Sequence, residues 1–431
     1  MTVASVGESK GSQVVAQNTC AGYIIPPSEL RRMERSTDHP GYLVEALEAG
    51  MKLGLPGISL VVSSSSGKQQ LTVGEGIDPD SVFCIGSITK TCVAIVVLQL
   101  VSEGRLDLDK STASNYVSHE ILAMLRRIPN ATTATIRHLL SHQSGIPTWE
   151  FQPQWIKDAR GECIDPETSW SSSQTLDYLL DSTTSTGHPG ECYSYSNTNY
   201  TILGHIVEGL TGNSIQDELR TRIWEPLGLN AFLCTTASLP STKCPTRLYH
   251  YVTPTFRHDA GVPLAYFDVV TEGKMDANLM ETSRGTNLSC EWAAGGVCMT
   301  MTDLHTFGLA LQQRSLLSTD MANAMMSYTP PQSDTMAYNG LGEAKTSLRA
   351  TGEEYCLGLC RTVDRDIWHH GGLTLSFSSR LLLLPGDTVV ACATNAGVMH
   401  SGYADGESPW DKFVEDILLP AVERYEASLP T

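Results

Sequence analysis

The distribution of apolar and polar residues changes twice along this chain. In residues 57–63 and 69–73, apolar and polar positions alternate on either side of a serine- and glycine-rich stretch, which is typical of a β-hairpin. Residues 93–101 then form a nearly unbroken apolar run, and later segments repeat their apolar residues at helical spacing. From about residue 355 onward, β-prone runs return. The pattern therefore predicts strands near both ends and a long helical middle.

The same pattern gives approximate bounds for the individual elements. We expect helices over residues 28–51 with a break at Pro40-Gly41, 87–101, 135–145 with a glycine end, 200–210, 215–224, 303–311 and 410–425. Thr302 or Asp303 is expected to cap the helix over 303–311. We expect strands over residues 57–63, 69–73, 356–361, 376–384 and 388–394, with a tight turn at 385–387. Weak periodicity predicts loops and short helices over 149–185 and irregular structure over 230–290, and the polar, glycine-rich residues 327–354 suggest a surface excursion.

Strands at both ends suggest one sheet that is built from the two ends of the chain. We expect a sheet lobe over about residues 23–85 plus 290–431, and a helical lobe over about 86–289 inserted between them. Residues 1–22 are polar and rich in small residues, so we expect a disordered or loosely draped tail there. A cleft between two such lobes is a natural place for a binding site.

Composition and charge exclude some functions. The chain has 431 residues, of which 41% are hydrophobic, and its net charge of −18 argues against binding nucleic acid through a broad basic face. The apolar run over residues 93–101 is too short to span a bilayer, so no membrane attachment is expected. The N-terminus lacks a basic start followed by an apolar core, which indicates a cytoplasmic protein without a signal peptide. The 12 cysteines form no Cys-x-x-Cys pair and are expected to be reduced, buried hydrophobes.

The first candidate for chemistry is Ser87, which precedes the apolar run together with Lys90. A spacing of three places the two side chains on one helix face, where an amine can take the proton of a hydroxyl and make it a nucleophile. A serine at this position is also a common helix N-cap, and the Ser-x-x-Lys string occurs a second time at residues 65–68, in the expected hairpin turn.

Two further segments carry polar groups that suit the same chemistry. Tyr195-Ser196-Asn197 supplies a phenol that can move a proton, because a nearby cation lowers the pKa of a tyrosine, and an amide that can bind both a lysine and a carbonyl. The same segment can also be a polar turn that caps a helix. His369-His370-Gly371-Gly372 precedes a strand, and its glycines allow the backbone N–H groups to approach an oxyanion. Adjacent histidines on a strand point to opposite faces, so we do not expect a metal site.

Taken together, these three segments resemble the serine β-lactamase and penicillin-binding-protein superfamily. The order Ser-x-x-Lys, Tyr-Ser-Asn and then His-His-Gly in place of Lys-Thr-Gly is similar to that of class C β-lactamases, D-alanyl-D-alanine carboxypeptidases and the related esterases and D-amino-acid amidases. Residues 135–145, 195–204 and 372–379 also read like family segments, so the resemblance covers about residues 40–425. It implies an α/β (α+β) fold with an antiparallel sheet flanked by helices and an inserted, mostly helical lobe.

The resemblance also implies a role for each residue. Ser87 would attack a carbonyl, Lys90 and Tyr195 would share the role of base, and Asn197 would position Lys90 and the substrate. The backbone N–H groups of Ser87 and Gly372, beside Gly371, would form the oxyanion hole.

His369 would take the place of the family lysine and bind a substrate carboxylate or assist Tyr195. Because histidine is mostly neutral at pH 7, this exchange weakens the case for β-lactamase and carboxypeptidase activity.

Three functions follow from this pattern. The leading expectation is a cytosolic hydrolase of a small ester or amide, acting through an acyl-Ser87 intermediate without a cofactor or metal. The second is an acyltransferase of secondary metabolism that passes the same acyl group to an alcohol or amine. The third is a binding protein that has kept the fold. The aromatic residues Trp149, Phe151 and Trp155 either line the pocket or anchor a loop to the core.

Overall fold

The structure is a computed structural model in which most of the chain can be described. The described residues are 14–18, 21–25, 41–64, 67–74, 76–161, 163–165, 167–180, 184–236, 243–261, 279–283, 286–333, 351–404 and 406–429. Within these ranges, none of the helices combines the length and apolar character needed to cross a bilayer.

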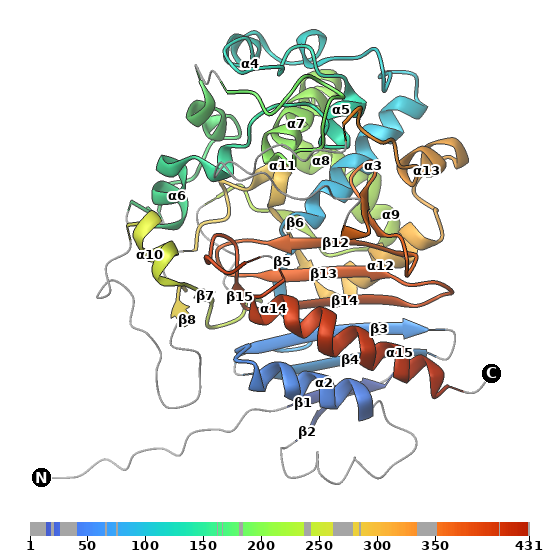
Figure 1. The fold of residues 1–431 in the computed structure, drawn as a ribbon. Coiled ribbons are helices and arrows are strands. Elements are labelled where there is room, and N and C mark those ends of the chain that lie inside the picture. The colour runs from blue at the N-terminus through green and yellow to red at the C-terminus, as the bar shows by residue number, and fades with distance from the viewer. Residues whose placement is uncertain are drawn as a thin grey trace, which may run out of the picture.

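Nine antiparallel strands form the central sheet, in the order β10-β11-β12-β13-β14-β3-β4-β1-β2 (Figure 1). Their bounds are β10 Glu353–Tyr355, β11 Cys360–Thr362, β12 Ile367–Leu373, β13 Ser378–Leu383, β14 Val389–Thr394, β3 Gly57–Ser64, β4 Gly67–Gly74, β1 Val14–Asn18 and β2 Ala21–Ile25. The two ends of the chain meet where β14 pairs with β3, with Ala391 opposite Val61. This arrangement confirms the prediction of one antiparallel sheet built from both ends.

The N-terminal segment differs from the expected loose tail. Strand β1 pairs with β4 and then with β2, so these ten residues extend the edge of the sheet. The rest of residues 1–22 lies outside the described residues, as does the part of the expected 28–51 helix that precedes α2 Gly41–Lys52.

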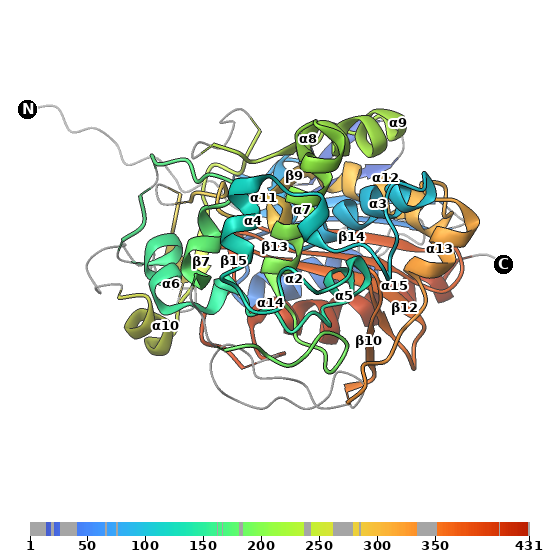
Figure 2. The ribbon, with the colours of Figure 1, turned by 90° about the horizontal axis from the view of Figure 1, so that it is seen from above.

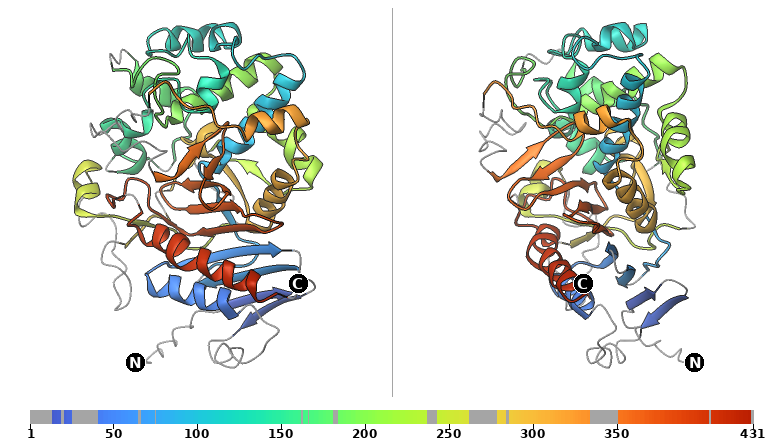
Figure 3. Two further views of the ribbon diagram at one scale, coloured as in Figure 1. Left: turned by 45° about the vertical axis from the view of Figure 1, so that its right-hand side comes forward. Right: turned by 90° about the vertical axis from the view of Figure 1, so that its right-hand side faces the viewer.

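Helices cover both faces of the sheet because successive strand residues point to opposite sides. On one face, Leu60 and Val390 pack with α2 and with the C-terminal helical segment, which consists of α14 Pro409–Lys412, the π-helical turn η6 Phe413–Leu418 and α15 Leu419–Ala427. On the other face, Val61 and Ala391 pack with α12 Met301–Gln312 and α3 Ile88–Ser102. The right-hand view of Figure 3 shows these layers edge on.

The helical part lies beyond one edge of the sheet, and Figure 2 looks down on it. Its helices are α4 His119–Leu125, α5 Ile136–Leu140, α6 Pro153–Arg160, α7 Asn197–Thr211, α8 Ile215–Leu219, α9 Glu225–Leu227, α10 Pro254–Asp259 and α11 Trp292–Gly295, with α13 Thr319–Met325 beside α3. The helix α3 is buried on nearly all sides, as its unbroken apolar run predicts.

Several predicted boundaries need correction. The helix α12 is capped by Thr300, whose hydroxyl accepts a hydrogen bond from the Asp303 amide, and not by Thr302 or Asp303. The helix α5 ends at Leu140 and not at a glycine. Most of residues 356–361 form the turn between β10 and β11, and the turn residues 65 and 66 lie outside the described residues.

Candidate active site

Ser87 stands at the start of α3, held there by a small second sheet. Strand β5 Val82–Cys84 pairs with β9 Val297–Thr300, and the Ile85 amide then donates to the Val297 carbonyl over 2.9 Å. Gly86 has φ +51°, a conformation that glycine adopts most easily, and it turns the chain into the helix. Ser87 occupies the N-cap position, but its side chain makes no capping bond. Ser87 is therefore at the N-cap position, as the capping interpretation predicted, but its hydroxyl does not cap the helix.

The hydroxyl of Ser87 is instead the partner of Lys90. The Lys90 Nζ donates to Ser87 Oγ over 2.9 Å and to the Ala294 carbonyl over 2.7 Å, and the side chain is buried. Burial lowers the pKa of Lys90 to about 7, against the opposing effect of the Glu150 and Glu291 carboxylates. The amine can therefore be unprotonated near neutral pH, as a base for Ser87 must be.

Tyr195 is a second partner of the Ser87 side chain. Its ring centroid is 5.0 Å from Lys90 Nζ, and its side chain is hydrogen-bonded with Ser87. Burial raises the pKa of Tyr195 well above its usual value, and the bond with Ser87 offsets this only in part. The sequence interpretation, in which a nearby cation lowers this pKa, is therefore wrong, and the phenol is neutral. Tyr193 lines the same cavity but is not the tyrosine bonded to Ser87.

Asn197 is the first residue of α7, as the alternative interpretation of a polar helix start requires, but its Oδ1 makes no hydrogen bond with the expected partner Lys90. Its Nδ2 donates to the Glu150 carboxylate, while the hydrogen bonds of the Lys90 amine go to Ser87 and Ala294. Burial raises the pKa of Glu150, against the opposing effect of the Lys90 charge. Sequence reasoning missed Glu150, because a single glutamate between two aromatic residues gives no signal for a buried carboxylate.

The two histidines of β12 have different neighbours. The Tyr355 hydroxyl and His370 Nε2 are 3.1 Å apart, and His370 Nδ1 lies 2.7 Å from the Gly371 carbonyl. Burial, with a smaller contribution from the Lys90 charge, lowers the pKa of His370 to about 3. His369 Nε2 instead lies 2.9 Å from the Glu353 carboxylate. The two histidines thus have different partners, Tyr355 and Glu353, although both line the cavity.

Glycines allow β12 to lie directly against the turn that carries Ser87. A Cβ on Gly372 would lie 1.8 Å from the Ile85 carbonyl oxygen, and a Cβ on Gly86 would lie 2.6 Å from the Leu373 nitrogen. The Ser379 hydroxyl also donates to the Ile85 carbonyl over 2.9 Å, which fixes the turn to the neighbouring strand β13. An oxyanion hole formed by the N–H groups of Ser87 and Gly372 stays a prediction that this close backbone contact supports.

A cavity of about 930 Å³ opens at these residues. Ser87, Glu150 and Tyr195 lie in its wall, and Arg380 is the only lysine or arginine among its described lining residues. Of the aromatic residues that the sequence singled out, Phe151 lines the cavity, whereas Trp149 and Trp155 are fully buried. Within the described residues, no group of three or more His, Cys, Asp or Glu side chains could hold a metal ion.

The chain is similar to known proteins of one family. A family model described as Beta-lactamase matches residues 43–405. Penicillin-binding protein 4 of Amycolatopsis lactamdurans is 34% identical over 186 residues, which cover 41% of this chain and 44% of that protein. A putative D-alanyl-D-alanine carboxypeptidase of Escherichia coli O157:H7 is 31% identical over 150 residues, or 35% of this chain and 33% of that protein. The aligned regions thus span less than half of these relatives.

Solved structures are similar over a longer stretch. A D-stereospecific amidohydrolase from Streptomyces sp. has a TM-score of 0.68 at 24% identity, covering 88% of this chain and 99% of its own. A D-amino acid amidase from Ochrobactrum anthropi SV3 has a TM-score of 0.66 at 22% identity, covering 90% and 100%. At this level of identity the similarity shows a common fold.

Proposed function

This chain belongs to the β-lactamase family, and on that premise we propose that it is a serine hydrolase that cleaves an ester or amide through an acyl-enzyme on Ser87. The observation that carries the proposal is the 2.9 Å contact between Lys90 Nζ and Ser87 Oγ at the wall of a large cavity. The carboxypeptidase and amidase relatives support hydrolysis as the reaction.

Lys90 is the residue that we assign as the base for acylation. Its pKa is lowered to about 7 by burial, whereas that of Tyr195 is raised well above 10. As Ser87 Oγ attacks the carbonyl carbon, the Lys90 amine takes the hydroxyl proton. The negative charge that develops on the carbonyl oxygen is stabilised by the N–H groups of Ser87 and Gly372.

The leaving group must then receive a proton. Tyr195 is neutral and hydrogen-bonded with Ser87, so its hydroxyl can donate to the departing oxygen or nitrogen and be reprotonated from Lys90. Water then attacks the acyl-enzyme, with Lys90 again as the base, and releases the acid and free Ser87. In this scheme Asn197 does not hold Lys90, because its amide is bound to Glu150.

An acyltransferase is the second candidate, since the same acyl-enzyme can react with an alcohol or amine instead of water. The size of the cavity favours it, because an acceptor needs room beside the acyl group. Thr255, Phe256 and Asp259 in the lining show that residues 230–290 contribute to that space. Incubation with an acyl thioester and candidate acceptors distinguishes the two candidates. Transfer yields an acylated acceptor, whereas hydrolysis yields only free acid whatever acceptor is present.

The direct test of the proposal is to replace the nucleophile and its base. Ser87→Ala is expected to reduce ester turnover by about a thousandfold or more and to abolish labelling by a fluorophosphonate probe. Lys90→Ala is expected to lose activity as well.

The second Ser-x-x-Lys string provides matched controls, because Ser65→Ala and Lys68→Ala change the same residue types in the other copy of the motif. Lys68 lies on β4 and is not among the described residues that line the cavity. Folded protein in which an intact Ser87 resists the probe would refute the proposal and favour a binding protein.

A further inference from the structure

The cavity is much larger than the reacting atoms of a small ester require. Part of its wall comes from elements that hold neither Ser87 nor Lys90: the helices α6, α10 and α14, the turn Trp149–Phe151, and the loop over residues 398–404. The helices α6 and α10 lie together at one end of the molecule, away from α3 (Figure 1 and Figure 2). We call this part the distal half, and we define it by Phe151, Ile156, Thr255, Phe256, Val398 and Trp410.

Five of these six defining side chains are apolar or aromatic. Phe256 and Trp410 are 1% exposed and Ile156 and Val398 are 7% exposed, so these four belong to the packed interior at the cavity wall. Phe151 is half-buried. The same elements also bring the side chains of Asp259, Ser408 and Asp411 to the cavity lining. The apolar part of the wall gains free energy when an apolar group displaces water from it, and it offers little to a charged one.

The walls of the distal half are fixed by packing. The ring of Phe151 meets that of His400 edge to face at 5.3 Å, and His400 also meets the buried Trp155 at 5.8 Å. Phe256 lies on α10, whose first turn is capped by Thr253, and its ring packs against His250 at 4.9 Å. A site whose walls are already ordered binds a ligand without the entropic cost of ordering them.

The loop over residues 398–404 is held against α10 by backbone contacts. The Thr253 amide donates to the Ser401 carbonyl over 2.9 Å. Gly402 has φ +83°, and a Cβ there would lie 2.1 Å from Thr253 Oγ1, so glycine is required for this close approach. The distal half is thus a preformed pocket that continues from the site of the chemistry.

From this arrangement we propose that the distal half binds a bulky apolar group, aryl or long alkyl, attached to one side of the scissile carbonyl. This inference rests on the proposed function and specifies its substrate class, replacing the small ester or amide expected from the sequence. A pocket of this kind discriminates by about tenfold or more for each well-buried part of the substrate.

Two ester series test the inference and identify the side that enters the pocket. In the first, p-nitrophenol is the constant leaving group and the acyl group grows from acetyl through butyryl to 4-phenylbutyryl. In the second, acetate is constant and the alcohol grows from methanol through benzyl alcohol to naphthylmethanol. We expect kcat/KM to rise at least about tenfold along one series. A flat or falling dependence in both series would overturn the inference.

Two variants connect that preference to the distal half. Phe151→Ala removes part of the wall, and Thr255→Trp fills space from an exposed position on α10, where it should not disturb folding. Both are expected to lower kcat/KM for the bulky ester about tenfold while leaving p-nitrophenyl acetate within about twofold. Equal losses for both esters in folded protein would contradict the assignment.

Fluorophosphonate labelling separates failure of the inference from failure of the proposed function. A phenylbutyl fluorophosphonate is expected to label Ser87 faster than an ethyl one in the wild type, and no faster in Thr255→Trp. Equal labelling rates in the wild type, together with a flat dependence in the alcohol series, would refute the distal pocket while leaving the nucleophile intact. If neither reagent labels Ser87, the proposed function fails and the inference fails with it.

Discussion

At the scale of the residue, the feature that distinguishes this site is a lysine amine enclosed with two carboxylates. Burial lowers the pKa of Lys90, and the charges of Glu150 and Glu291 raise it by a smaller amount. Glu291 is itself paired with the buried guanidinium of Arg160, and Glu150 accepts from Asn197. The balance between burial and these charges decides whether the amine is a base at neutral pH.

The pH dependence of activity tests this balance. Because the unprotonated amine is the active form, kcat/KM should rise by about tenfold per pH unit below pH about 7 and level off above it. The Glu150 charge raises the pKa of Lys90, so Glu150→Gln should move this rise to lower pH.

Glu150→Asp is the matched control for that shift. It keeps a carboxylate, and its profile should stay closer to that of the wild type. A Glu150→Gln profile that lies at higher pH than the wild type would contradict this assignment of charges.

At the scale of the element, the site depends on how closely the edge of β12 approaches the turn before α3. Positions 371 and 372 are both glycine, but their surroundings differ. The missing Cβ of Gly372 faces the Ile85 carbonyl, which is backbone and cannot move aside. The missing Cβ of Gly371 would lie 3.1 Å from the end of the flexible Arg380 side chain.

This difference predicts opposite outcomes for two similar substitutions. Gly372→Ala should push β12 away from Ser87 and lower kcat by about a hundredfold, because the second oxyanion donor is displaced. Gly371→Ala should have little effect, since Arg380 can shift. Steady-state kinetics with p-nitrophenyl acetate checks both variants. Similar losses of kcat in the two would show that activity does not depend on the close contact between Gly372 and the Ile85 carbonyl.

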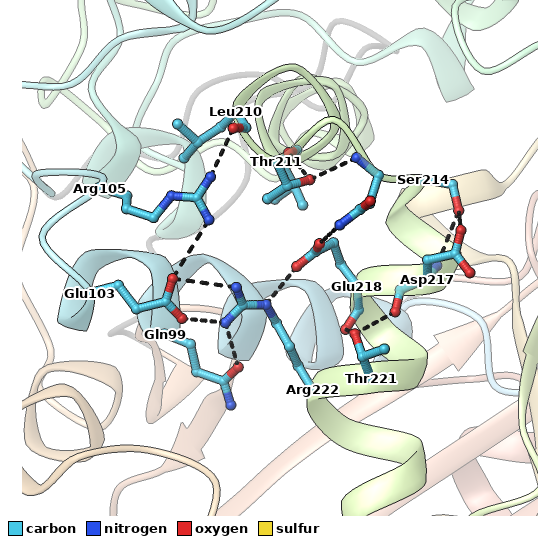
Figure 4. Close-up of polar contacts among 12 residues, drawn as sticks. Gln99, Glu103, Arg105, Leu210, Thr211, Ser214, Asp217, Glu218, Thr221 and Arg222 are labelled. Atoms are coloured by element: carbon cyan, nitrogen blue, oxygen red, sulfur yellow. Dashed lines mark hydrogen bonds and ion pairs between the residues drawn. The ribbon is translucent and has the colours of Figure 1, made fainter.

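The far end of α3 is fixed by ion pairs instead. Figure 4 shows Arg222, on the π-helical turn η4 Arg220–Trp224 that follows α8, between the carboxylates of Glu218 and Glu103. The contacts are 2.6 Å to Glu218 and 2.5 Å to Glu103, and the Glu218 side chain is 6% exposed. Arg105 also donates to the Leu210 carbonyl at the end of α7 over 2.8 Å. These contacts hold α3, α7 and α8 together at the end opposite Ser87.

Arg222→Ala should therefore lower the free energy of unfolding by about 1–2 kcal/mol, because it leaves the buried Glu218 carboxylate with only the uncharged side chains of Asn213 and Thr211 as partners. Urea denaturation measures this change. The matched control is Arg220→Ala on the same turn, whose partners Asp217 and Glu225 are exposed and whose loss should cause no measurable change. Equal urea midpoints for the two variants would show that burial of the Glu218 partner does not make the Arg222 ion pairs more stabilising than those of Arg220.

At the scale of the whole molecule, stability depends on joining the two ends of the chain. Strand β14 pairs with β3, and the C-terminal helical segment covers a sheet face that contains Leu60 and Val62 from the N-terminal half. Trp410, Phe413 and Leu418 are almost fully buried in that interface. The sheet lobe therefore cannot form from one end alone.

Deletion of residues 408–431 should consequently abolish cooperative unfolding, because it exposes the apolar face of the central strands. A control that lacks only residues 430 and 431 should unfold like the intact chain. Thermal denaturation followed by circular dichroism checks both. A shortened chain with a sharp transition near that of the intact protein would show that the C-terminal helices are dispensable.

The sequence alone determined the features that depend on local pattern. The alternation of apolar residues predicted β3 and β4, the unbroken apolar run predicted the buried helix α3, and the spacing of Ser87 and Lys90 predicted their contact, because residues three apart share a helix face. The order of the motifs was enough to indicate the family.

The tertiary structure alone decided what depends on neighbours distant in the sequence. It brought Glu150 to Asn197, gave His369 and His370 different partners, and determined the direction in which the pKa values of Lys90 and Tyr195 shift. It also assembled the distal half from segments between residues 151 and 410. Burial and the direction of a side chain result from packing between remote segments, so the residues themselves carry no local signal for them.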